Sequence, residues 1–252
     1  MDKLEKVVII TGAARGLGQT YARRFAERGA RIVVCDLRSC DDTVSMCRDA
    51  GADAIGFETD VTDASSAQAM ADHALERFRG IDVLINNAAL FGSLRFAPFD
   101  KLDESEWDAA MSVNVKGIWH CCRAVLPAMR DAGAGSIINI SSLAAVYGMP
   151  NGLHYTTSKA AVIGLTRGLA REVGRFNIRV NAVAPNVVDT QAAGEFFGDK
   201  KEKLMEATTA QMSLRKPVEA DDLFGTMLYL ASEQSSHTTG QTLMVDGGTV
   251  FL

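Results

Sequence analysis

Seven short apolar segments, nearly continuous and rich in Val and Ile, recur along the chain. Consecutive apolar positions are typical of strands that are buried on both faces, as in a parallel sheet covered by helices. The segments predict strands at residues 6–10, 31–35, 54–57, 83–85, 136–140, 179–183 and 242–245.

Longer segments with helical periodicity separate these strands. They predict helices at residues 17–28, 64–79, 104–130, 152–173 and 219–231. Gly29 and Gly80 follow two of them, and glycine is a common signal for the end of a helix. Sustained alternation of strands and helices predicts an α/β fold with a doubly wound parallel sheet, helices on both faces and one domain over residues 1–252.

Residues 190–217 break the alternation, because this segment is too long for an ordinary connection between a strand and a helix. The segment mixes Phe196, Phe197, Met205 and Met212 with charged side chains. Two interpretations are open: a helical substrate lid over a pocket, and a surface excursion that packs its own apolar residues. We favour the lid, because long insertions beside the ligand edge of a sheet are often functional.

The composition is that of an ordinary globular protein. The 252 residues carry a formal net charge of −5, with 47% hydrophobic and 23% charged residues. A mildly acidic chain with scattered basic residues argues against a nucleic-acid or membrane partner. The five cysteines contain no CxxC pair, and His120 has no spaced partner motif, so we expect no disulfide framework and no metal site.

We expect a cytoplasmic protein. The first ten residues begin with several charged side chains and lack the long apolar stretch of a signal peptide. The longest uncharged stretch, residues 132–158, is interrupted by polar side chains and is not typical of a transmembrane helix. Reduced thiols also fit a reducing compartment.

A glycine-rich loop follows the first predicted strand and precedes the first predicted helix. Its sequence, TGAARGLG at residues 11–18, has GxxxGxG spacing. Gly12 permits a tight turn, Gly16 lets backbone N–H groups approach a pyrophosphate, and Gly18 allows close contact between helix and strand. The N-terminus of the helix then faces the anion with its positive dipole end, so the loop predicts a dinucleotide site.

Asp36 ends the second predicted strand, eighteen residues after Gly18. A carboxylate there can accept hydrogen bonds from ribose hydroxyls and would repel a 2′-phosphate, which favours NAD over NADP. Arg15 and Arg38 could instead reach a phosphate. We give Asp36 more weight, because arginine near a pyrophosphate also serves NAD; a helix cap or turn residue is the simpler alternative for Asp36.

Ser142, Tyr155 and Lys159 form the densest polar cluster in an apolar setting. Tyr155 and Lys159 are four residues apart and share one helix face. A nearby lysine ammonium favours the phenolate and lowers the pKa of the tyrosine, which then becomes a proton acceptor from an alcohol. YxxxK alone occurs by chance in many helices, and a surface lysine beside a packed tyrosine is the simpler interpretation. An upstream serine pair and a glycine-rich first loop make the chemical interpretation stronger.

With these motifs in family order, the chain resembles the short-chain dehydrogenase/reductase family over essentially its full length. The matching pieces are TGAARGLG at 11–18, Asp36, Asp60-Val61, Asn86-Asn87-Ala88, Asn114, Ser142, Tyr155 and Lys159, Asn181-x-Val183-x-Pro185, Thr190 and Asp246-Gly247-Gly248. The resemblance implies a Rossmann-type fold and a homotetramer, with the helices that end near Arg130 and Val173 at one interface.

The resemblance also implies roles for individual residues. Tyr155 would be the general acid/base, Lys159 would lower its pKa and bind the nicotinamide ribose, and Ser142 would orient the substrate oxygen. Asn114 would hold a water that joins Lys159 to solvent. Asp60 and Val61 would contact the adenine, Asn87 and Ala88 would line the cofactor cleft, and Val188 and Thr190 would meet the carboxamide. With the loop and Asp36, the predicted cofactor residues are Gly12, Arg15, Gly16, Leu17, Gly18, Asp36, Asp60, Val61, Asn87, Ala88, Tyr155, Lys159, Val188 and Thr190.

Two residues depart from the family pattern. Ala89 stands where the family has glycine, and it adds a methyl group where the backbone nears the cofactor. Asn186 stands where the family has glycine after Pro185. Asparagine tolerates a positive φ better than most residues, so the turn can survive, and its amide could reach the pocket. Both changes affect the shape of the pocket and leave the proton-transfer residues intact.

The predicted substrate contacts are mostly apolar. They are Ser142, Leu143, Tyr147, Tyr155, Asn186, Phe196 and Phe197, with Phe91, Leu94 and Phe96 as further candidates for the wall. The alternative is that these residues are simply core. We expect a neutral secondary alcohol or ketone of moderate size and an NAD(H)-dependent oxidoreductase. The alternatives are an NADPH-dependent 3-oxoacyl-thioester reductase and a catalytically idle NAD(H)-binding sensor or scaffold.

Overall fold

A seven-stranded parallel sheet forms the centre of the molecule. The computed structural model describes residues 3–189, 194, 198 and 201–251. The strands are β1 (Val7–Thr11), β2 (Arg31–Asp36), β3 (Ala54–Glu58), β4 (Val83–Asn86), β5 (Gly135–Ile140), β6 (Ile178–Pro185) and β7 (Thr242–Val245). Their order is β3-β2-β1-β4-β5-β6-β7. The strands β2 and β3 are added on one side of β1 and the strands β4 to β7 on the other, so the order of addition reverses between β1 and β4. This arrangement confirms the predicted doubly wound sheet.

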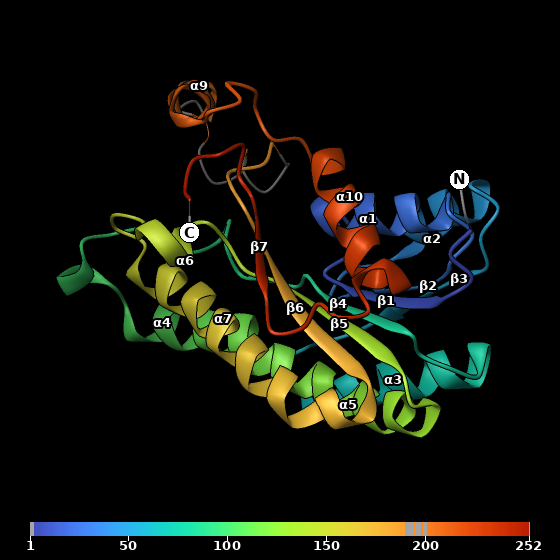
Figure 1. Ribbon diagram of the computed structural model, residues 1–252. Coiled ribbons are helices and arrows are strands. Elements are labelled where there is room, and N and C mark those ends of the chain that lie inside the picture. Colours follow the sequence, from blue (N-terminus) through green and yellow to red (C-terminus); the bar gives the residue numbers. More distant parts are fainter. Residues whose placement is uncertain (1–2, 190–193, 195–197, 199–200, 252) are drawn as a thin grey trace.

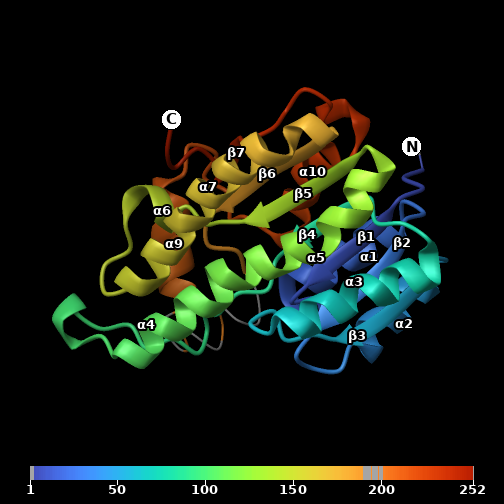
Figure 2. The same ribbon diagram turned by 90° about the horizontal axis from the view of Figure 1, so that it is seen from below.

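Helices cover both faces of the sheet (Figure 1). One face carries α1 (Gly16–Ala26), α2 (Asp41–Asp49) and α10 (Ala220–Ala231). The other carries α3 (Ala64–Phe78), α5 (Gly117–Ala132) and α7 (Leu153–Val173), which Figure 2 shows in front of the strands. The shorter helices are α4 (Glu104–Met111), α6 (Ala144–Tyr147) and α9 (Lys201–Gln211).

The strand sequences explain the two layers. Alternate residues of a strand point to opposite faces, so Val7 and Ile9 pack against α3 and α5 while Val8 and Ile10 pack against α1 and α10. All four side chains are fully buried. Continuous apolar runs are therefore required here, because neither face of β1 meets water.

The structure corrects several predicted helices. The single helix expected at residues 104–130 is divided into α4, a π-helical turn at Ser112–Lys116 and α5. A π-turn widens the helix locally and is frequent at functional sites. The helices α2 and α6 were not predicted, because each is short and lacks a long apolar period.

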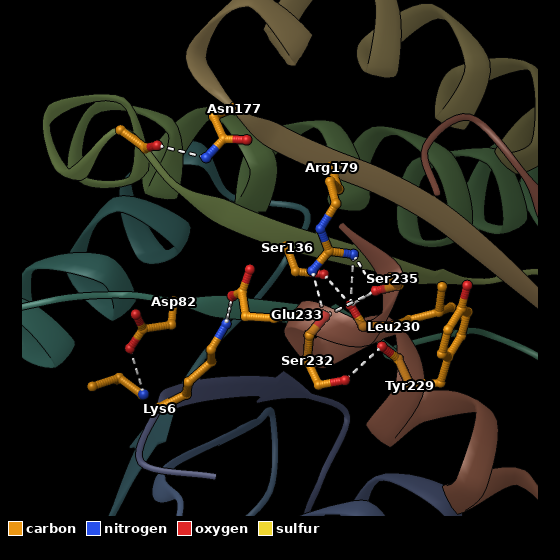
Figure 3. Close-up of polar contacts among 12 residues, drawn as sticks. Lys6, Asp82, Ser136, Asn177, Arg179, Tyr229, Leu230, Ser232, Glu233 and Ser235 are labelled. Carbon is orange, nitrogen blue, oxygen red and sulfur yellow. Dashed lines mark hydrogen bonds and ion pairs between the residues drawn. The ribbon is translucent and has the colours of Figure 1, made fainter. Parts of the chain in front are cut away.

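Polar side chains at the amino ends of β5 and β6 join these strands to the end of α10 (Figure 3). The buried Arg179 guanidinium donates hydrogen bonds to Leu230 O at 2.9 Å, to Ser232 O at 3.2 Å and to the Ser235 hydroxyl. Ser136 also donates to Leu230 O at 2.8 Å. A cation at the C-terminus of a helix satisfies its last carbonyl groups, so this cluster fixes the end of α10 against the sheet.

Among the helices of the described residues, none is long and apolar enough to cross a membrane.

Candidate active site

A cavity of about 490 Å³ lies along the carboxyl ends of the strands. Its lining residues come from the connections that follow β1, β2, β3, β4, β5 and β6. The loops after β1 and β4 leave the sheet in opposite directions, because their helices cover opposite faces. Ligands of open α/β sheets bind in the crevice that such a reversal creates.

The glycine-rich loop has no room for larger side chains at two positions. A Cβ on Gly12 would lie 2.6 Å from Ala88 Cα, and a Cβ on Gly18 would lie 2.8 Å from Ala13 Cα. Gly16 has a φ of +60° and open space around its Cα, on the side of the loop that lines the cavity. The loop therefore presents unobstructed backbone at the N-terminus of α1, which is the arrangement that binds a pyrophosphate.

Thr11 and Asn87 hold this loop against the end of β4. The Thr11 hydroxyl accepts hydrogen bonds from the backbone N–H groups of Asn87 and Ala88, each at 3.1 Å. The Asn87 amide donates to Thr11 O at 3.0 Å and to Gly12 O at 2.9 Å. The role of Thr11 was missed from the sequence, although its place directly before Gly12 is the signal that could have identified it.

The Asp36 carboxylate lines the cavity beside the glycine-rich loop. It accepts a hydrogen bond from Ala14 N at 3.0 Å and another from Arg38 N at 3.1 Å. The bond from Arg38 N closes a local turn, so Asp36 is a turn residue, as the simpler interpretation predicted. The bond from Ala14 N also connects Asp36 to the glycine-rich loop. A carboxylate has about four acceptor positions, so two remain for hydroxyl groups of a ligand.

Asp60 and Val61 form the adjoining wall of the cavity. Asp60 accepts hydrogen bonds from the Thr62 N–H at 2.8 Å and the Thr62 hydroxyl at 2.7 Å. Val61 is fixed from behind, because His120 Nδ1 lies 3.0 Å from its carbonyl oxygen and α5 begins against its side chain at Gly117. The wall is therefore rigid, and His120 serves it by hydrogen bonding.

Ser142, Tyr155 and Lys159 meet at the cavity floor. Ser142 follows β5, and the two others lie on one face of α7. Lys159 Nζ donates to Ile140 O at 2.9 Å and lies 5.8 Å from the centre of the Tyr155 ring. The Ser141 hydroxyl donates to Lys159 O at 2.8 Å, which ties α7 to the end of β5.

Burial determines the protonation of this cluster. It raises the pKa of Tyr155 to about 12; a hydrogen bond from Ser142 lowers this pKa and the charge of Tyr147 raises it. Burial also lowers the pKa of Lys159 to about 8. The expected lowering of the tyrosine pKa by Lys159 is thus wrong for the protein groups alone, because desolvation of the phenolate is the larger effect.

Asn114 lies in the π-turn and is fully buried. Its amide donates to Leu90 O at 3.1 Å and to the Ser158 hydroxyl at 3.0 Å, and its oxygen accepts from Leu90 N at 2.7 Å. Both amide hydrogens are engaged, so none remains to donate to a water. The side chain ties the connection after β4 to α7 through Leu90 and Ser158, and Ser158 directly precedes Lys159 in the sequence.

The two departures from the family pattern have different consequences. Ala89 is exposed and lines the cavity. Asn186 takes a negative φ, and its amide donates to the Thr249 hydroxyl at 2.8 Å while its oxygen accepts from Val187 N at 2.7 Å. The expectation that its amide reaches into the pocket is wrong, because these bonds direct it toward the C-terminal segment.

The half of the cavity near Tyr155 is apolar and aromatic. The Phe91 ring packs against Tyr155 at 4.9 Å between ring centres. Leu94 and Phe96 lie in a second layer behind Phe91, outside the cavity lining. No arginine lines this half among the described residues; Arg15 and Arg38 belong to the end near Asp36.

The structure brings most of the predicted site residues to one cavity. Those that line it are Gly12, Arg15, Gly16, Leu17, Asp36, Asp60, Val61, Asn87, Ala88, Ser142, Leu143, Tyr147, Tyr155, Lys159, Asn186 and Val188. Gly18 and Asn114 lie behind the lining. Thr190, Phe196 and Phe197 lie outside the described residues. Lining residues that were not predicted include Leu37, Thr59, Ser93 and Val113.

The predicted lid is partly described. The segment returns to the fold through a parallel bridge between Val188 and Val218, and its end is held by hydrogen bonds from Ser213 N and Leu214 N to the 247–248 turn. It contains the helix α9. Of the described residues beyond Val188, none lines the cavity, so its function as a lid remains a prediction.

The residues present fit a dinucleotide with a nicotinamide. The cavity joins an open glycine-rich loop, a carboxylate placed for hydroxyl groups, and a phenol with a lysine at the far end. Within the described ranges, no group of three or more His, Cys, Asp or Glu residues could hold a metal ion.

Comparisons with known proteins find relatives that match nearly the whole chain. The family model described as enoyl-(acyl carrier protein) reductase matches residues 12–250. The chain is 35% identical to the 3-oxoacyl-(acyl-carrier-protein) reductase of Thermotoga maritima over 248 residues, covering 98% of both proteins. Levodione reductase has a similar structure, with a TM-score of 0.91 and 28% identity, covering 97% of both chains. The structure of NAD⁺-bound xylitol dehydrogenase is also similar, with a TM-score of 0.89 and 28% sequence identity, covering 96% of this chain and 98% of that chain.

The chain therefore belongs to the short-chain dehydrogenase/reductase family. Members of this family are oxidoreductases that bind a nicotinamide cofactor. The coverage is nearly complete in both directions, so the family assignment and the fold that the sequence predicted are confirmed.

Lys159→Met tests the burial of the ammonium group. Because the pKa of Lys159 lies near 8 when folded and near 10.5 when unfolded, the unfolded chain binds more protons between these values. The cost of burying the charge is complete below pH 8 and disappears above about pH 10.5. The variant should therefore gain stability relative to the wild type at pH 7, by roughly 3 kcal/mol, and lose this gain by pH 10.5.

Urea unfolding at pH 7, 8.5 and 10 measures this difference. Lys203→Met, which removes an exposed lysine of α9, is the control for loss of a positive charge. A difference between Lys159→Met and the wild type that does not change with pH would contradict the burial argument.

Proposed function

We propose that this protein is an NAD(H)-dependent alcohol dehydrogenase or ketone reductase. The observation that carries the proposal is the meeting of Ser142, Tyr155 and Lys159 at one end of a cavity whose other end is the glycine-rich loop. A substrate whose oxygen-bearing carbon lies in this cavity would then react beside the Tyr155 hydroxyl, which can donate a proton. When bound, the nicotinamide supplies or accepts the hydride.

The chain's own residues manage the proton and the position of the substrate. The Tyr155 hydroxyl donates its proton to the carbonyl oxygen during reduction, and the Tyr155 phenolate accepts the proton of the alcohol during oxidation. Ser142 holds the same oxygen by a hydrogen bond. The Lys159 ammonium favours the phenolate when the proton leaves, and its bond to Ile140 O offsets only part of its cost of burial.

Asp36 supports NAD as the cofactor. A 2′-phosphate beside this carboxylate would meet a like charge and would have to displace the water around it. The alternative is an NADPH-dependent 3-oxoacyl-thioester reductase, which the Thermotoga maritima relative favours by its name. Arg15 and Arg38 lie near the same end of the cavity and would have to outweigh Asp36 for that alternative to hold.

A neutral secondary alcohol or ketone of moderate size is the substrate class that we propose. The walls near Tyr155 are formed by Leu90, Phe91, Leu143 and Met149, and no cationic side chain other than Lys159 lines this half among the described residues. A carboxylate or phosphate on the substrate would therefore lack a charged partner there.

Residues 190–217 act as a lid over the substrate in this proposal. The bridge between Val188 and Val218 brings the two ends of the segment together beside a residue that lines the cavity. The five free thiols are all buried and support the cytoplasm as the compartment.

A homotetramer is the proposed assembly, through the outer faces of α5 and α7. Trp119 on α5 is 46% exposed. Ala160, Gly164 and Gly168 are exposed at four-residue spacing on α7, and neither glycine has an atom near its Cβ position. Glycine inside a helix costs about 1 kcal/mol relative to alanine, and close approach of a second helix would explain two of them on one face.

Tyr155→Phe removes the hydroxyl that carries the proton. We expect kcat for a secondary alcohol to fall by about 10²- to 10⁴-fold while the Kd for NADH changes little. Stopped-flow or steady-state absorbance at the NADH band, with fluorescence titration of Trp107 and Trp119, separates the two effects. Tyr229→Phe, which alters a tyrosine outside the cavity, is the matched control. Turnover like that of the wild type in Tyr155→Phe would eliminate the mechanism.

Asp36→Asn keeps the size of the side chain and removes its charge. The wild type should bind NADH more tightly than NADPH, and the variant should lose on the order of tenfold of this preference because the repulsion of the 2′-phosphate is gone. Asp42→Asn, on the exposed start of α2, controls for the change in net charge. Tighter binding of NADPH by the wild type would favour the thioester reductase instead.

Gly164→Leu fills the open position on α7. We expect light scattering after gel filtration to give four chains for the wild type and fewer for the variant, because the added side chain separates the packed helices. Glu76→Leu places the same side chain on the exposed face of α3 and should leave the mass unchanged. A monomeric wild type would refute the assembly.

A further inference from the structure

Two hydroxyl groups of the cavity lining have no hydrogen-bond partner among the described residues. They belong to Ser93, on the connection after β4, and to Tyr147, the last residue of α6. The other hydroxyls of the lining are engaged; Thr59 donates to Phe57 O, and Ser141 donates to Lys159 O. A polar group on an otherwise apolar wall is the kind that fixes the orientation of a ligand.

The backbone of Tyr147 is held on both sides. Its N–H donates to Leu143 O at 3.4 Å, within the helical turn that begins beside Ser142. The next turn, at Gly148 with a φ of +77°, leads to Met149, whose N–H donates to the Thr156 hydroxyl at 3.1 Å. Tyr147 is thereby tied to α7 next to Tyr155, and half of its side chain remains exposed at the mouth of the cavity.

The position of Tyr147 relative to Ser142 determines what it can reach. The short helix α6 begins two residues after Ser142 and rises by about 1.5 Å per residue, so the backbone of Tyr147 lies roughly 4.5 Å beyond that of Ala144 along the axis. Leu143, Ala144 and Met149 fill the wall in between. A ligand whose reacting oxygen lies at Ser142 and Tyr155 therefore passes an apolar stretch before it meets the second phenol.

We infer that the substrate carries a second, uncharged oxygen and that the Tyr147 phenol donates a hydrogen bond to it. This inference rests on the proposed function and narrows its substrate class to hydroxy-ketones, diols and diketones with an apolar body. Burial raises the pKa of Tyr147, so the phenol keeps its proton and remains a donor. Tyr147 is preferred to Ser93 because its backbone is anchored by α6 and by the bond from Met149 to α7, whereas Ser93 lies in a turn.

The test compares two alcohols that differ only at the far end of the ring. 1,4-Cyclohexanediol carries the second oxygen, and 4-methylcyclohexanol has a methyl group in its place. Tyr147→Phe should raise KM for the diol about 3- to 10-fold more than KM for the methyl compound, which corresponds to one hydrogen bond. The loss should appear in KM, because the remote bond is equally present in the ground state and the transition state.

Ser93→Ala is the matched variant, since it removes the other hydroxyl without a partner. In Ser93→Ala, the ratio of KM for the diol to KM for the methyl compound should stay as in the wild type. An equal rise in KM for both alcohols in Tyr147→Phe would indicate lost packing and would overturn the inference. Loss of the difference in Ser93→Ala alone would assign the contact to Ser93 and overturn it as well.

A wild type that oxidises neither alcohol with NAD⁺ or NADP⁺ would contradict the proposed function for this substrate class. The binding step is then measured directly, by titrating the NADH complex with each alcohol and following Trp107 and Trp119 fluorescence. Weaker diol binding in Tyr147→Phe supports the inference even without turnover. Equal binding by the variant and the wild type, or no binding at all, overturns it.

Discussion

The burial of both faces of the parallel sheet is the constraint on which the rest of the structure depends. Side chains within the strands are committed to the two apolar layers, so chemistry is possible only where strands end. The clamp between Thr11 and Asn87 then sets the distance between the first loop and the end of β4. Most groups that line the cavity take their positions from this edge, and α7 supplies Tyr155 and Lys159.

Burial removes water from the two ionisable groups of the candidate site, Tyr155 and Lys159. Lys159 is buried with one carbonyl partner, and Tyr155 is buried against Phe91, so both ionised forms are disfavoured in the protein alone. Tyr155 can act as a base only as the phenolate. When its pKa is raised, little phenolate forms until a positive charge comes near the ring. Proton transfer in such a site is therefore coupled to what else is bound, which limits idle ionisation between turnovers.

The sequence predicted the sheet, the two-sided helical cover and most of the cavity lining, because these follow from continuous apolar runs and from motifs next to strand ends. It did not predict the π-turn that places Asn114, since a one-residue widening of a helix leaves no mark in the apolar period. The direction of the Asn186 amide and the balance of the Tyr155 pKa were also beyond it. Both depend on distant neighbours, the Thr249 hydroxyl in one case and the degree of burial in the other.

The turn at residues 246–249 links several distant parts of the chain. Asp246 accepts hydrogen bonds from the backbone N–H groups of Gly248, Thr249 and Val250, while Asn186, which lines the cavity, and Ser213 also donate hydrogen bonds to the same turn. Figure 1 shows the C-terminus near α6, and the N-terminus on the far side of the sheet. For attachment to a surface or fusion to another protein, the amino end is therefore the sensible handle. A load on the carboxyl end would pull on the turn that holds Asn186 in the cavity wall.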